Sequence, residues 1–254
     1  MQIFPAKLEH VSSLSELVFD AATLFSVWRS AFRAVETSSG LQQLSEIANC
    51  GISLSGDFDR WSKKLPRAYA YDKKSLSTIP QLQWLGALLD GDWVPECVHQ
   101  YPSPVSQMLW RFYWVTRLVL CQVLLYTHMT LEKAPTISNP MTTIQKDIQC
   151  CLLSLIDRLC ESCLTPFAAP NQSSLKSRDQ IRSLQGYLLL QILPTVGLCV
   201  DQVVISDANL TARKDWICKM RECLKSHFGF AKVATFIQPS RYAQLPIQLW
   251  GLEQ

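Results

Sequence analysis

The sequence is poor in charged residues, which make up 18% of its 254 residues against about 25% in an average soluble domain. The net charge is only +3, and the basic pairs are scattered along the chain: Lys63-Lys64, Lys73-Lys74 and Arg213-Lys214. So small and dispersed a charge does not indicate a nucleic-acid-binding surface. No basic run resembles a nuclear-import signal.

Glycine is scarce as well, with nine residues, and no glycine-rich loop for phosphates or dinucleotides is present. The segment from Gly51 to Gly56 resembles the turn that carries the serine of hydrolases, but the glycine expected two residues after Ser53 is missing. No histidine lies in a zinc-protease pattern. The sequence therefore predicts no catalytic, cofactor-binding or metal-binding residue, and a protein that is not an enzyme.

Two weaker groups of residues have ordinary structural explanations. Cys97 and His99 could be paired metal ligands, but the prolines around them favour a surface loop. The carboxylate pairs Asp57/Asp59 and Asp90/Asp92 could support acid–base chemistry only in a cleft that raises one pKa, and Asp90-Gly91-Asp92 is typical of a turn.

The ten cysteines lack the spacing of a disulfide framework or a zinc site. Only Cys160 and Cys163 form a C-x-x-C pair, and no second pair accompanies it. Several others stand within apolar helical patterns, where a thiol behaves as a small hydrophobe. We expect buried, reduced thiols in an intracellular compartment, and the N-terminus lacks the layout of a signal peptide.

What the sequence does contain is a helical period of apolar residues, which make up 48% of the chain. It predicts an all-α fold, an irregular bundle of about eight helices forming a single domain over residues 1–254. Ser13 and Glu16 form a capping box that would begin the first helix, Gly51 would close the second, and Pro166 would end a long one. The expected helices cover residues 13–35, 41–48, 58–65, 81–89, 104–126, 144–163, 184–200 and 210–228, and no strand is expected.

The helix after residue 103 should be central in this fold. Ser103 can cap it with Pro104 at its first position. Its apolar side chains occupy much of its girth: Val105, Met108, Leu109, Phe112, Val115, Val119, Val123 and Tyr126 form one face, widened by Trp110, Trp114 and Leu118. The apolar windows 109–126 and 184–205 contain polar residues and are interpreted as core helices rather than membrane spans.

Four pieces of the chain, in order, resemble the C-terminal regulatory region of fungal binuclear zinc-cluster transcription factors, of the type met beside secondary-metabolite genes. The first is Phe58 to Trp61 with Leu65-Pro66 and the tyrosines at 69 and 71. The others are residues 110–118 with their tryptophans and arginines, residues 156–167 ending in Pro166-Phe167, and the segments 186–190 and 216–229. The resemblance is strongest over residues 58–237.

The resemblance implies a regulatory domain that acts on transcription through protein contacts, dimerisation or a small-molecule effector. The expected location is the nucleus, or the cytoplasm if the chain is not imported with a partner. The six-cysteine DNA-binding module of the family is not present in these 254 residues. We therefore expect no direct nucleic-acid contact and no membrane association. The expected partner is a protein, either a full-length transcription factor or a second copy of the chain. The chain would be a fragment of a longer regulator or a natural short form.

The apolar helices are also compatible with an alternative function. An enzyme or a small-molecule-binding protein could use an apolar cavity between the helices at 110–126 and 184–200. A filled core is the simpler expectation for the same apolar surfaces.

Overall fold

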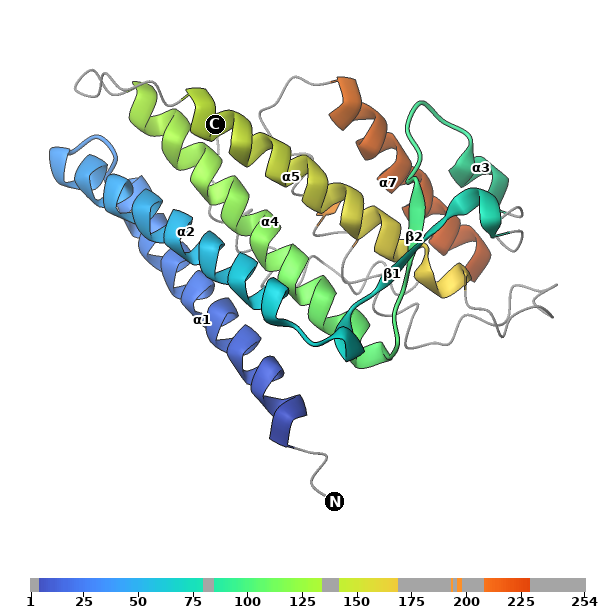
Figure 1. Cartoon of the computed structure of the whole chain (residues 1–254). Coiled ribbons are helices and arrows are strands. Elements are labelled where there is room, and N and C mark those ends of the chain that lie inside the picture. The colour runs from blue at the N-terminus through green and yellow to red at the C-terminus, as the bar shows by residue number, and fades with distance from the viewer. Residues whose placement is uncertain are drawn as a thin grey trace. The chain divides into compact units, whose positions relative to one another are not determined.

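A computed structural model describes residues 5–79, 85–133, 142–168, 193, 196–197 and 208–228. The described part is mainly α-helical, as the sequence predicted, and it contains five long helices rather than about eight (Figure 1). The long helices have the following bounds: α1 Pro5–Arg33, α2 Ser38–Lys64, α4 Pro104–Lys133, α5 Thr142–Cys163 and α7 Ala208–Phe228.

The remaining elements are short. They comprise a one-turn helix, α3 (Gly86–Leu89), two strands, β1 (Asp72–Ser75) and β2 (Cys97–Gln100), and 3-10 turns at Arg67–Tyr69, Leu76–Thr78 and Thr165–Phe167. The chain falls into two compact units. Unit 1 comprises residues 1–70 and 103–155, and unit 2 comprises residues 71–102 and 156–254.

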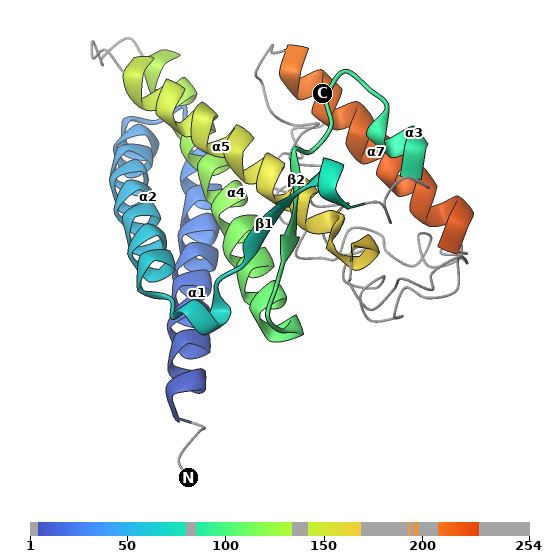
Figure 2. The same cartoon turned by 45° about the vertical axis from the view of Figure 1, so that its right-hand side comes forward.

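Unit 1 is built on α1, α2 and α4, which lie side by side in both views (Figures 1 and 2). Its core is aromatic. Trp28, Phe58 and Trp114 are fully buried, and the ring of Trp61 stacks on that of Tyr113 with centroids 5.4 Å apart. The Trp28 indole joins two of these helices, because its Nε1 donates to Thr127 Oγ1 at 2.8 Å and so links α1 to α4.

The ends of α1 and α2 differ from those the sequence predicted. α1 begins at Pro5 instead of at Ser13, whose hydroxyl donates back to the His10 carbonyl within the helix. α2 begins after Thr37, which caps it by accepting from the Gly40 N–H at 3.0 Å, and runs through Gly51 to Lys64. The predicted helices at 41–48 and 58–65 are therefore one helix.

Gly51 lies inside α2 instead of ending it, and its lack of a side chain matters for packing. A Cβ placed there would lie 2.7 Å from Leu124 Cδ2, so the missing side chain lets α2 approach α4 closely. At Gly56, five residues further along the same helix, a Cβ would make an ordinary contact with Arg60 Nη1 at 3.8 Å. A packing role of this kind depends on another helix and is not visible in the local sequence.

Other predicted boundaries are confirmed. The Ser106 N–H donates to Ser103 Oγ at 3.1 Å, and α4 begins at Pro104. α5 ends at Cys163, just before the turn that contains Pro166, and α7 covers the helix expected at 210–228. Of the helix expected at 81–89, α3 is the described part. The helix expected at 184–200 lies almost wholly outside the described residues.

Unit 2 contains the two strands, which the sequence did not predict. β1 and β2 are antiparallel, with Lys73 opposite His99 and Ser75 opposite Cys97. Each strand has four residues, too few to display a clear alternation of apolar and polar side chains. In the same unit α7 packs on α3, and Trp216 Nε1 donates to the Leu88 carbonyl at 2.9 Å.

α4 is the one described helix that is long and apolar enough to cross a membrane by length and composition. Within its apolar window, 78% of the residues are buried inside the protein, and core helices commonly meet the same criterion.

The two glycines of α2 provide a matched test of this packing. Gly56→Ala should stabilise unit 1 by up to about 1 kcal/mol, because alanine favours the helix and its methyl group meets no clash, with Arg60 Nη1 at 3.8 Å. Gly51→Ala should lose that gain, because the new methyl group must displace Leu124, and overpacking typically costs about 1–3 kcal/mol. Chemical denaturation measures both variants. Equal stabilities would contradict the close approach.

His128 of α4 should make unit 1 less stable in acid. The side chain is buried, and its ring nitrogens have no hydrogen-bond partner among the described residues. Burial lowers the pKa of His128, although Glu132 opposes the shift, so the unfolded chain binds a proton more readily than the folded one. The free energy of unfolding should therefore fall as the pH drops below about 6.5.

His128→Leu cannot be protonated and should show a smaller loss of melting temperature between pH 7.5 and pH 5.5 than the parent chain. Thermal unfolding followed by circular dichroism measures this difference. Identical pH profiles of the two chains would mean that His128 does not contribute to the loss of stability in acid.

Candidate functional site

An exposed apolar row runs along the first half of α4. Val105, Met108 and Phe112 are 51%, 39% and 56% exposed, and Val115 and Val119, which continue the row, are partly exposed. Alternating steps of three and four residues place them on one stripe of the helix. The sequence placed these residues on the apolar face of a central helix. Part of the predicted apolar surface is in the core, namely Leu109, Trp110, Trp114, Leu118 and Val123, whereas Val105, Met108 and Phe112 are exposed.

A second candidate is a buried polar cluster in unit 2, formed by Cys97 and His99 of β2 with Glu161 of α5. His99 Nε2 lies 2.8 Å from Glu161 Oε2, and the ligand atoms of all three residues lie within 4.8 Å of one another. Lys73 of β1 donates to the same Glu161 oxygen at 2.9 Å. In the part of the chain that the structure describes, these three residues are the group that could hold a metal ion.

The surroundings of the cluster orient the imidazole. His99 Nδ1 lies 3.1 Å from the Tyr101 hydroxyl, which donates to Ser162 Oγ at 3.0 Å. The His99 backbone carbonyl accepts from the Thr165 hydroxyl at 2.8 Å, which ties β2 to the turn after α5. The ring of Tyr71 lies against that of His99, with centroids 4.2 Å apart. The position of His99 is therefore fixed from several directions.

The charges of the cluster follow from burial and hydrogen bonding. Burial by itself would raise the pKa of the Glu161 carboxyl, but hydrogen bonds from His99, Cys97 and Lys73 outweigh it and hold this pKa at about 2. Burial lowers the pKa of His99 and raises the pKa of the Cys97 thiol to about 12, with Glu161 adding to the latter. Near neutral pH the cluster holds an ionised Glu161, a neutral His99 and a protonated Cys97.

The sequence placed Cys97 and His99 in a surface loop, and this prediction is wrong. Both residues are buried on β2, and their spacing of two positions puts their side chains on the same face of the strand. The nearby prolines flank the strand and do not interrupt it. Sequence reasoning missed Glu161 altogether, because it lies 62 residues from His99 in a segment that the sequence marks only as helical.

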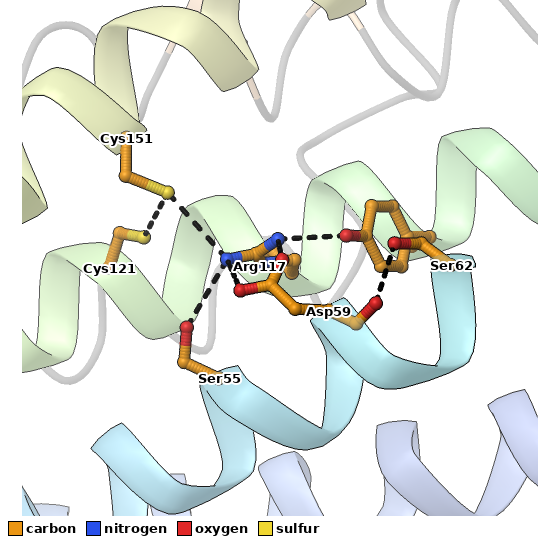
Figure 3. Close-up of polar contacts among 7 residues, drawn as sticks. Ser55, Asp59, Ser62, Arg117, Cys121 and Cys151 are labelled. Atoms are coloured by element: carbon orange, nitrogen blue, oxygen red, sulfur yellow. Dashed lines mark hydrogen bonds and ion pairs between the residues drawn. The ribbon is translucent and has the colours of Figure 1, made fainter. Parts of the chain in front are cut away.

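Unit 1 has its own buried polar centre at Arg117 of α4 (Figure 3). The guanidinium pairs with Asp59 of α2, donates to Tyr113 Oη at 2.7 Å and to Ser55 Oγ at 3.2 Å, and contacts Cys151 Sγ of α5 at 3.7 Å. Burial disfavours the charge, but Tyr113, Cys151 and Asp59 outweigh it and raise the pKa of Arg117 above its usual value. The arrangement joins three helices.

Two cysteines stand beside this centre. The Sγ atoms of Cys121 and Cys151 are 3.6 Å apart, and the described cysteines form no disulfide. The hydrogen bond with Cys151, followed by burial, raises the pKa of the Cys121 thiol. The expectation of buried thiols is confirmed for Cys97, Cys121, Cys160 and Cys163, and it is wrong for Cys50, Cys150 and Cys218, which are exposed.

The remaining residues that the sequence singled out do not gather into a site. Asp57 pairs with Arg60 on the surface while Asp59 pairs with Arg117, so these carboxylates have separate partners. Gly51 to Gly56 lies inside α2 and forms no catalytic turn. A pocket of about 430 Å³ lies against α7 in unit 2, lined by Trp93, Trp216, Asp92, Asp215 and Lys219 among others.

Removing the guanidinium of Arg117 should lower the free energy of unfolding much more than removing that of Arg60. Arg117→Met leaves Asp59 and the Tyr113 hydroxyl without their guanidinium, and we expect a loss of about 2 kcal/mol in the free energy of unfolding. Arg60→Met, the control, removes an exposed pair on one helix and should cost less than about 0.5 kcal/mol. Denaturant titrations of the two variants test this, and similar losses would contradict it.

Comparisons of the chain with protein-family models, with curated proteins and with solved structures give no match. The resemblance to the zinc-cluster regulators therefore rests on the sequence pieces quoted above.

Proposed function

We propose that this chain is a non-catalytic regulatory module of transcription-factor type that acts through protein–protein contacts. The observation that carries the proposal is the exposed apolar row of α4, from Val105 to Val119. Isolated exposed apolar side chains are common on proteins, but a continuous stripe on one helix is typical of a surface that another chain covers.

The pattern of the row favours a second helix as its occupant. Apolar residues at alternating steps of three and four form the seam along which two helices pack side by side. The five residues of the row carry no charge, so two copies of the same row can approach without repulsion between like charges. A two-fold axis would place each Phe112 against the partner row, in the self-complementary way that homodimers use.

The partner that we propose is therefore a second copy of the chain. The resemblance extends this to mixed pairs with a full-length relative, and to a nuclear location in which the relative, and not this chain, contacts DNA. The low content of charged residues supports the same proposal, because it leaves apolar surface available for contact.

The mass of the purified chain in solution tests the proposal. Light scattering coupled to size exclusion should give twice the 28.8 kDa of the single chain at micromolar concentration. Phe112→Asp should weaken the association by about tenfold or more, because it places a charge at the centre of the row. A parent chain that stays monomeric at all accessible concentrations would overturn the proposal.

Phe19→Asp is the matched control. Phe19 is 71% exposed on α1 and lies outside the row, so its replacement should leave the dimer intact. Equal weakening by both variants would mean that the effect of Phe112→Asp comes from general solubility or folding. Circular dichroism of both variants checks that their helix content is unchanged.

A further inference from the structure

We propose that Cys97, His99 and Glu161 form a binding site for a divalent transition-metal ion of the zinc type. The sequence predicted no metal site, and the proposed protein–protein contact does not need one. The site lies wholly within unit 2, so the two proposals fail or succeed separately.

The choice of metal follows from the three ligand types. A thiolate, an imidazole and a carboxylate are all ligands that proteins use for Zn²⁺, and the sulfur selects against Mg²⁺ and Ca²⁺. Zn²⁺ with these ligands in tetrahedral geometry needs ligand atoms roughly 3.3–3.7 Å apart. The atoms of the cluster already lie within 4.8 Å of one another, with His99 Nε2 and Glu161 Oε2 at 2.8 Å, so small side-chain movements suffice.

The neighbours of His99 suit a metal-bound imidazole. The Tyr101 hydroxyl gives its proton to Ser162 Oγ, so its oxygen can accept from Nδ1–H of His99. Without metal, Nε2–H of His99 donates to the Glu161 carboxylate. Metal binding would move this proton to Nδ1, where the Tyr101 oxygen can accept it, and the neutral imidazole would then present a lone pair at Nε2, on the side of Glu161 and Cys97. A hydrogen bond from the non-ligating nitrogen is the usual support of a histidine that binds zinc.

A metal ion at this site would take the position beside Glu161 that the Lys73 ammonium now occupies. This ammonium lies 2.9 Å from Glu161 Oε2, while the Lys73 side chain is 49% exposed and can turn toward solvent. Metal binding would release the Cys97 proton and displace this ammonium, and a water would complete four-fold coordination. Lys73 is therefore a competitor of the metal, which gives the proposal a distinctive test.

The first experiment measures zinc binding to the full-length chain after removal of metal by a chelator. Competition with a chromophoric chelator should show one tight Zn²⁺ per chain. Co²⁺ in place of Zn²⁺ should give the absorption of a thiolate-to-cobalt charge-transfer band. Cys97→Ser should abolish this band and lower the zinc affinity by about tenfold or more.

Two further variants make the result specific. Cys218→Ser removes an exposed cysteine of α7 and should leave both readouts unchanged. Lys73→Gln should tighten zinc binding several-fold, because it removes the competing ammonium from Glu161. A purely structural Lys73–Glu161 pair predicts no such gain.

The proposal is overturned if the chain binds no stoichiometric Zn²⁺, or if the cobalt complex lacks the thiolate band. It is overturned equally if Cys97→Ser binds as tightly as the parent chain, or if Lys73→Gln gains no affinity. Lys73→Gln changes a half-exposed side chain, so the test remains decisive even where Cys97→Ser does not fold.

Discussion

The buried carboxylate of Glu161 sets the arrangement of the residues around it in unit 2. An ionised carboxylate inside a protein needs opposite charge and hydrogen-bond donors around it, because removal from water costs several kcal/mol. The β1–β2 ladder supplies both, since its register puts Lys73 opposite His99, and both side chains reach Glu161. The two strands are too short to be stable alone, and contacts with α5 and the turn that follows it hold them.

The same constraint acts in unit 1 with the opposite sign of charge. Arg117 stands in a helix that is otherwise apolar over most of its girth, and it is tolerated because Asp59, Ser55 and Tyr113 converge on it. Replacing the whole centre, Arg117 together with its partners, by apolar side chains of the same shape would change the free energy of unfolding little, whereas removing Arg117 alone leaves Asp59 without its guanidinium. The centre does fix the register of α2 against α4, which Gly51 and Leu124 bring into close contact. Because these contacts fix the rotation of α4 about its own axis, they also fix the direction in which its exposed row faces.

The sequence was informative where the structural cause is local. Ser103 and Pro104 marked the start of α4 because a cap and a proline act on the first turn of their own helix, and Pro166 marked the end of α5. The full length of α2 was missed because Gly51 allows close packing against Leu124 of α4 and does not end the helix, and this contact is not visible in the local sequence. Cys97 and His99 were noticed as a pair, but Glu161 was missed as their neighbour because it reaches His99 across 62 residues. Periodicity also identified apolar stripes on α4 but could not decide which stripe the core would cover, since that depends on where α1 and α2 pack.

The charge balance of the Glu161 cluster explains how one buried site can exist with and without a metal ion. Without metal, the ammonium of Lys73 and the carboxylate of Glu161 cancel, while His99 and Cys97 are neutral. With Zn²⁺ bound, the two charges of the ion would cancel those of the Cys97 thiolate and the Glu161 carboxylate, and Lys73 would carry its charge into water. Both states are neutral in the buried region, so neither requires an uncompensated charge away from solvent. The exposed stem of Lys73 makes the exchange possible, because a fully buried ammonium could not leave without moving the fold.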